Sequence, residues 1–325
     1  MSSSNKAIGG YFELELPAQK PFLYPDANCF QSARAAFLAL LQIGKPKRVW
    51  IPLYICDSML APLRKAGVEF SFYSVNEKFH IVGDINMSPN DWLLYVNYFG
   101  ICNDYIDRIL AKFNPNQIVL DYSQAFYSPS RKCLAIIYSP RKFFGVPDGG
   151  LLVTCLPLVM PSVIDDGAVG RTTHLLKRLA GSAESGYADY QKAEQSLVEF
   201  EPHQMSSLTR RILNSVDFEE VRIRRNSNLL FLHEKLGKIN KLLIDPLSID
   251  GPLCYPFFIA QSGIRERLIS ERVFVATYWP DVLSMVDDSS CEASLVKNII
   301  PLPCDQRYGD EEMKKISDIC LDMLV

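Results

Sequence analysis

The sequence lacks the features that would indicate a metal site, a disulfide framework or a secreted protein. Its nine cysteines are scattered and odd in number, and none forms a Cys-x-x-Cys pair, which is typical of reduced thiols in a cytosolic protein. The four histidines lie far apart, without the spacing of zinc ligands, so no metal is expected. The segment MSSSNKAIGG has no apolar signal core, and the predicted location is therefore cytoplasmic.

Strong charge and long hydrophobic runs are also absent. The net charge of −3 gives no electrostatic reason to expect nucleic acid or an anionic membrane as a partner. The most apolar stretch, 149–164, is too short to span a bilayer and contains two prolines. With 48% apolar and 22% charged residues the composition is that of a globular protein, and 325 residues exceed the usual size of a single core. Two closely packed domains are expected.

Segments typical of strands and helices alternate in the first half of the chain. Strands are predicted where branched and aromatic residues gather, at 48–52, 68–75, 92–99, 117–121, 133–139 and 150–154. Helices are predicted between them, at 32–44, with Gly44 as the C-terminal stop, at 57–67 and at 104–113. Near-continuous apolar strands separated by helices favour an α/β fold with a mostly parallel sheet between helices. Ligands are then expected at the carboxyl ends of the strands.

The pattern changes in the second half of the chain. A polar region at 170–200 is expected to be helical. Leu208, Ile212 and Val216 recur every four residues, as in one apolar stripe of a single long helix over 205–237.

The C-terminal part predicts a smaller unit. Its expected elements are strands at 254–260 and 272–279 and a closing helix at 311–324. We expect a large domain over 15–230, which includes the long connecting helix, and a smaller α+β domain over 231–325.

Reactive side chains follow two consecutive predicted strands and begin one helix. Asp121 ends one strand with Gln124 three residues later, and Ser139 ends the next strand with Lys142 three residues later. Ser32 begins a helix, where free backbone N–H groups and the helix dipole favour a phosphate. Pyridoxal 5'-phosphate (PLP) needs a lysine for its Schiff base, an acidic partner for its pyridinium nitrogen and a phosphate cradle. These side chains can fill all three roles.

Each group would have a defined chemical role. An aspartate beside the ring nitrogen keeps that nitrogen protonated, because an adjacent negative charge favours the cation. The protonated ring accepts the electrons released when the substrate loses a proton, and Lys142 is placed to move that proton as a general base.

The order of these motifs resembles the PLP-dependent sugar aminotransferase family of fold type I. The resemblance runs from about Tyr24 to Leu324. In chain order, the similar segments are SARAAF at 32–37, VWIPLYIC at 49–56, the Asp-x-x-Gln pair of Asp121 and Gln124, Lys142 before Gly149 and Gly150, MSSLTRRIL to RIRRN within 205–226, and IIPLPCDQRYGDEEMKKI at 299–316.

The resemblance implies a fold, an activity and a set of site residues. The fold is the fold type I PLP transferase, and the activity is transfer of an amino group from an amino acid, with glutamate as donor, to a keto-sugar linked to a nucleotide. Such a reaction belongs to amino-sugar or surface-polysaccharide biosynthesis. A homodimer with each site near the subunit boundary is also implied. The residues expected to bind the cofactor are Lys142 and Asp121, which are also catalytic, with Gln124, Ser32, Ala33, Arg34, Ser139 and Cys56.

Two positions depart from the family pattern. Ile137 stands where the family commonly has a phosphate-binding serine, and Ser139 is expected to take over that contact. Pro202 lies nearest the place of an asparagine that reaches the neighbouring subunit, so either His203 or Gln204 supplies the contact or the contact is absent. Either Cys56 or Tyr54 stands where the family places a residue against the cofactor ring, and Tyr278 and Trp279 are expected to serve packing.

Structural interpretations of the same residues stay open. Lys142 beside Arg141 can be a basic surface turn, and Asp121 a helix cap or turn former. Ser32 can be a plain N-cap, a role compatible with a phosphate contact. Two other functions also remain, namely a PLP enzyme of another reaction type and a non-catalytic protein that retains the fold.

Overall fold

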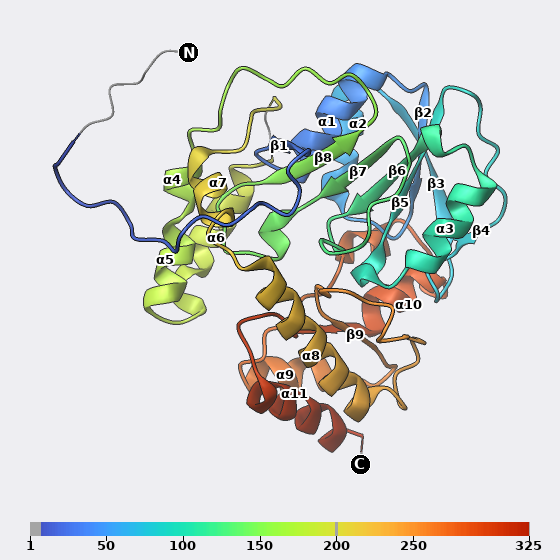
Figure 1. Cartoon of the computed structure of the whole chain (residues 1–325). Coiled ribbons are helices and arrows are strands. Elements are labelled where there is room, and N and C mark those ends of the chain that lie inside the picture. The colour runs from blue at the N-terminus through green and yellow to red at the C-terminus, as the bar shows by residue number, and fades with distance from the viewer. Residues whose placement is uncertain (1–7, 199–200, 325) are drawn as a thin grey trace.

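The computed structural model describes residues 8–198 and 201–324, and this part of the chain contains one large and one small sheet (Figure 1). The large sheet has eight strands in the order β1-β8-β7-β6-β5-β2-β3-β4. Its strands are β1 (Asn28–Phe30), β2 (Arg48–Pro52), β3 (Glu69–Val75), β4 (Ile81–Val82), β5 (Asp91–Val96), β6 (Ile118–Tyr122), β7 (Ala135–Tyr138) and β8 (Gly150–Thr154).

The middle of this sheet is parallel. Strands β3, β2, β5, β6 and β7 run in one direction, while β8, β1 and β4 are antiparallel to their neighbours. Every residue of β5 and β6 is buried, because helices and connecting segments cover both faces of the sheet. The predicted α/β class with a mostly parallel sheet is confirmed.

Three helices connect the parallel strands. They are α1 (Ala33–Gly44), α2 (Leu60–Ala66) and α3 (Asn103–Lys112). Ser32 begins α1 as its N-cap, since its hydroxyl accepts a hydrogen bond from the Ala35 N–H at 3.1 Å. Helix α1 ends at Gly44 as predicted, but Lys45 is the residue with left-handed backbone, at φ 44°. Gly44 is needed for another reason, because a Cβ there would lie 2.3 Å from the Trp92 ring.

The predicted single helix over 205–237 is wrong. The structure has two helices there, α7 (Ser207–Leu213) and α8 (Phe218–Leu236), and Val216 lies between them. The break has a local cause: the Asp217 side chain accepts from the Glu220 N–H at 3.1 Å and so begins a new helix.

The polar region at 170–200 contains helices, as expected. They are α4 (Ala168–Arg171), α5 (Thr173–Ala180) and α6 (Tyr187–Gln195). The end of the predicted region, residues 199–200, lies outside the described residues.

The C-terminal part has a two-stranded sheet packed against helices. Its elements are β9 (Tyr255–Phe258), α9 (Ile264–Ser270), α10 (Cys291–Asn298), β10 (Ile299–Leu302) and α11 (Asp310–Asp322). The predicted strand at 272–279 is wrong: both of its ends, Arg272 and Trp279, have left-handed backbone, with φ 63° and 58°. Val275 and Trp279 are buried from an irregular segment instead, while Phe274 is exposed, and β9 pairs with β10.

Two clusters of buried apolar side chains stabilise the chain. The first surrounds the large sheet, and the second joins α8, β9, α9, β10 and α11. The second cluster begins at Leu229, close to the predicted division at 230/231, which stays a prediction. None of the described helices is long and apolar enough to cross a membrane.

Candidate functional site

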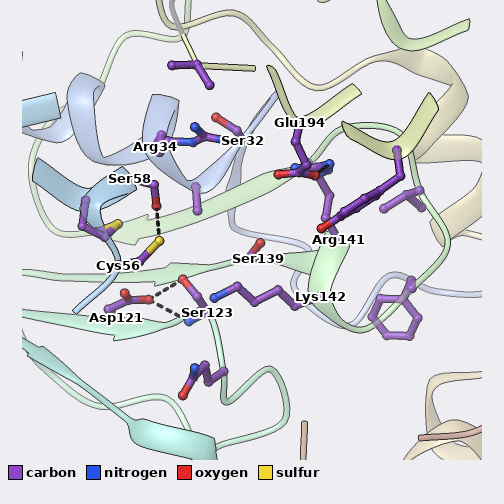
Figure 2. Close-up of a pocket in the computed structure, with 18 of the residues that line it drawn as sticks. Ser32, Arg34, Cys56, Ser58, Asp121, Ser123, Ser139, Arg141, Lys142 and Glu194 are labelled. Carbon is purple, nitrogen blue, oxygen red and sulfur yellow. Dashed lines mark hydrogen bonds and ion pairs between the residues drawn. The ribbon is translucent and has the colours of Figure 1, made fainter. Parts of the chain in front are cut away.

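A cavity of about 480 Å³ opens where α1 begins and where β6 and β7 end (Figure 2). Because β6 and β7 are parallel neighbours, the residues that follow them meet at one edge of the sheet. All eight residues predicted to bind the cofactor line this cavity: Ser32, Ala33, Arg34, Cys56, Asp121, Gln124, Ser139 and Lys142.

Lys142 ends a short 3-10 turn, Pro140–Lys142, directly after β7 and Ser139. Figure 2 shows its side chain extended toward Asp121 and Ser123. Its amine forms no hydrogen bond or ion pair with any described residue. Lys142 is exposed and lines the cavity, and a lysine there without a carboxylate partner is available for covalent chemistry.

Asp121 lies near the end of β6 and is 4% exposed. Its Oδ1 atom accepts from the Ser123 N–H at 2.8 Å and also from the Ser123 hydroxyl. Its Oδ2 atom accepts from no described residue. One carboxylate oxygen therefore fixes the orientation of the side chain, while the other is open to a ligand.

Gln124 is 1% exposed and uses only one end of its amide. Its Oε1 atom accepts from the Phe99 N–H at 3.0 Å, where the Phe99 backbone is left-handed with φ 55°. Its Nε2 atom is buried and has no partner among the described residues. Buried donors in native proteins are nearly always paired, so this amide indicates the acceptor group of a ligand.

The Gly-Gly pair after Lys142 brings β8 against the start of α1. A Cβ at Gly150 would lie 2.1 Å from the carbonyl carbon of Ser32, and Gly149 has φ +131°. The Gly149 N–H donates to the Gln31 carbonyl at 2.7 Å. Glycine is therefore required here by a close approach of two backbones. It places the N-terminus of α1 beside the lysine turn.

Two guanidinium groups add positive charge to the cavity. Arg34, in the first turn of α1, is half-buried, and no described residue pairs with it. Burial lowers the pKa of the Arg34 guanidinium, and Glu194 opposes that shift. Arg141 forms an ion pair with Glu194 of α6. Sequence reasoning missed this pair, because Glu194 lies 53 residues from Arg141 and no local pattern connects them.

Of the two residues predicted to face the cofactor ring, only Cys56 lines the cavity, where its sulfur accepts from the Ser58 hydroxyl at 3.0 Å. Tyr54 does not, because it is fully buried and stacks on Phe79 and Tyr98 in the core. Trp279, expected to serve packing, is 8% exposed and also reaches the cavity wall.

The segment expected at a subunit boundary is held against its own chain. The His203 N–H donates to Gln31 Oε1 at 2.7 Å, and the Gln204 side chain donates to the Pro161 carbonyl at 2.6 Å. Neither of these residues nor Pro202 lines the cavity. Ile137, at the place of the missing serine, is fully buried in β7.

Comparisons with known proteins establish the fold. No family model matches the sequence, and no curated protein matches it. Among solved structures, the sugar aminotransferase CalS13 from Micromonospora echinospora is 15% identical with a TM-score of 0.58, over 91% of this chain and 87% of that one. PseC from Helicobacter pylori, an aminotransferase involved in the biosynthesis of pseudoaminic acid, is 14% identical with a TM-score of 0.56, over 91% and 86%. NtdA from Bacillus subtilis, solved with bound cofactor PMP, is 14% identical with a TM-score of 0.65, over 92% and 73%. The chain has the fold of these proteins, as the resemblance of its motifs implied.

Proposed function

We propose that this chain is a PLP-dependent aminotransferase that transfers an amino group from an amino acid to a keto-sugar, in amino-sugar or surface-polysaccharide biosynthesis. One observation carries the proposal. The Lys142 amine, the Oδ2 of Asp121 and the Nε2 of Gln124, none of which has a partner among the described residues, belong to side chains that line one cavity beside a helix N-terminus. Three solved proteins of the same fold are aminotransferases or bind PMP.

The residues present fit PLP. Lys142 would hold its aldehyde carbon, Asp121 its ring nitrogen, and the buried donor of Gln124 the phenolic oxygen attached to the ring. Ser32, Ala33 and Arg34 would hold its phosphate at the start of α1, with Ser139 next to the lysine turn. When bound, PLP supplies an electron sink for the bond broken at the amino-bearing carbon. Cys56 would lie against the ring, at a position where an aromatic residue would offer more stacking area.

Each protein group then has one task. The Asp121 carboxylate would keep a proton on the ring nitrogen of bound PLP, because a negative charge nearby favours the cation. The Lys142 amine would act as the general base that takes a proton from the amino-bearing carbon of the substrate. Arg34 and Arg141 provide guanidinium forks suited to a phosphate or to a carboxylate of the donor, for which the resemblance implies glutamate.

A second cavity supports a nucleotide-linked acceptor. It has a volume of about 710 Å³ and shares His174 and Tyr190 with the first cavity. Its wall combines basic and aromatic side chains, which suit a diphosphate and a base. These are Arg178, Arg272, Arg307, Lys315, Tyr187, Phe274 and Tyr308.

A homodimer is the proposed assembly. Apolar side chains of the N-terminal segment are exposed, with Tyr11 at 100% and Phe12 at 95%, and this segment extends away from the body (Figure 1). On α4 and α5, Val169 and Leu179 are exposed at 72% and 85%. Exposed apolar groups in such number favour burial against a second copy.

Titration of the purified protein with PLP tests the proposal. We expect a yellow complex, whose visible band disappears when glutamate is added and returns when the acceptor is supplied from a panel of nucleotide-linked keto-sugars. Absence of any visible band in PLP-saturated protein would refute the proposal that PLP is the cofactor. A band that responds to amino acids but to no keto-sugar would favour a PLP enzyme of another reaction type.

A further inference from the structure

Helix α8 contains an arginine that is almost fully buried. Arg225 is 1% exposed, and its guanidinium donates to backbone carbonyls and one amide. Nη2 donates to the Phe143 carbonyl at 3.0 Å, Nη1 to the Pro252 carbonyl at 2.7 Å, and Nε to Gln306 Oε1 at 2.8 Å. Within the described part of the chain, none of the groups that accept from Arg225 is a carboxylate. A buried cation that no carboxylate contacts is unfavourable for stability, and burial lowers its pKa, so its position calls for an explanation.

Gln306 completes a closed set of hydrogen bonds. While its Oε1 accepts from Arg225, its Nε2 donates to the same Phe143 carbonyl at 2.9 Å. The Arg225 guanidinium also lies 4.8 Å from the Phe143 ring centre. The Phe143 carbonyl, which belongs to the part of the chain that forms the large sheet, therefore accepts from Arg225 of α8 and from Gln306, which precedes α11.

Phe143 is the residue that follows Lys142. The Phe143 and Phe144 N–H groups both donate to the Pro140 carbonyl at 2.9 Å. These two hydrogen bonds stabilise the turn that contains Lys142. The Lys142 amine has no partner of its own among the described residues. The direction of its side chain therefore depends on the backbone turn, and the far end of that turn is fixed by Arg225 and Gln306.

We propose that Arg225 and Gln306 are positioning residues that hold the Lys142 turn in the orientation needed for covalent attachment of the cofactor. This inference rests on the proposed function, since it requires PLP to be bound through Lys142. The orientation of the Lys142 side chain then depends on the positions of α8 and of the C-terminal part, which supply the two donors to Phe143.

The test is a double-mutant cycle on the equilibrium binding of PLP, followed by absorbance and by quenching of tryptophan fluorescence. Gln306→Glu keeps the acceptor for Arg225 and replaces the donor to Phe143 by an oxygen. We expect it to weaken PLP binding about fivefold or more, as for one lost hydrogen bond. In the Lys142→Ala background the same substitution is expected to change non-covalent PLP binding by less than about twofold.

Two further variants control for general damage. Arg225→Lys keeps a cation but loses the planar fork, and it should show the same dependence on Lys142. Arg222→Met removes an arginine one turn earlier on α8, which pairs with Asp250 and Glu219 and does not contact Phe143. It should leave PLP binding unchanged in both backgrounds.

The outcomes separate this inference from the proposed function. Equal losses in the two backgrounds, or no loss in either, would overturn the positioning role. A Lys142-dependent loss in Arg222→Met as large as that in Gln306→Glu would also overturn it. Failure of the unsubstituted protein to bind PLP would overturn the proposed function itself, and is seen before any variant is measured.

Discussion

Asp121→Asn is the substitution whose effect the structure defines most closely. The change replaces one oxygen of a side chain that is 4% exposed and leaves its shape unaltered. Oδ1 can continue to accept from the N–H and hydroxyl of Ser123, so the –NH2 group replaces the free Oδ2. The variant should therefore fold normally, with a free energy of unfolding within about 1 kcal/mol of the original.

The effect on turnover should be large. The variant presents a donor where a protonated ring nitrogen needs an acceptor, and it removes the negative charge that keeps the proton there. A charge-assisted hydrogen bond contributes about 1.5–3 kcal/mol. We expect turnover to fall on the order of a hundredfold, which corresponds to about 2.7 kcal/mol of barrier.

The assay is a single-turnover reaction of the PLP-saturated variant with the amino donor, followed by absorbance. Asp148→Asn is a matched control, because Asp148 is fully buried but does not line the cavity. Its carboxylate accepts from Ser206 and Thr209 at the start of α7, so that variant should lower the unfolding temperature and retain turnover per folded molecule. Near-normal turnover in Asp121→Asn would mean that Asp121 is a structural turn former and that the account of the ring nitrogen is wrong.

Further predictions concern stability and assembly. Gly150→Ala should lower the free energy of unfolding by about 3 kcal/mol because its Cβ would overlap the Ser32 backbone, whereas Gly170→Ala, with no atom within 4 Å, should be neutral or stabilising in a urea titration. Equal stability of the two variants would contradict the close approach of β8 and α1. Light scattering should give about twice the chain mass of 36.8 kDa, and replacing both Tyr11 and Phe12 by serine should raise the dimer dissociation constant at least tenfold. A fully active monomer would rule out a shared site.

Much of the fold and of the site follows from local sequence patterns. The alternation of apolar strands and helices predicts the parallel sheet, because buried parallel strands need apolar residues on both faces. Asp121 pairs in register with Val96 and Ile137, so side chains that follow β6 and β7 meet at one edge. Reactive residues at the ends of two consecutive strands therefore predict a common site, without knowledge of any long-range contact.

What the sequence could not provide depends on contacts between distant residues. The helix break before α8 had a local signal, the capping residue Asp217, which the apolar stripe outweighed in the prediction. The strand prediction at 272–279 failed since β propensity does not reveal whether a partner strand exists. No local sequence pattern indicates that Arg225 is buried, because its partners Phe143 and Gln306 lie about eighty residues away on either side.

The most direct measurement of the central claim is the site of covalent attachment. The protein is saturated with PLP, reduced with borohydride and digested, and the labelled peptide is identified by mass spectrometry. Since Lys142 is the lysine that lines the cavity with Asp121 and Gln124, the label should lie on Lys142 and be lost in Lys142→Ala. A label on any other lysine, or none in saturated protein, would contradict the account.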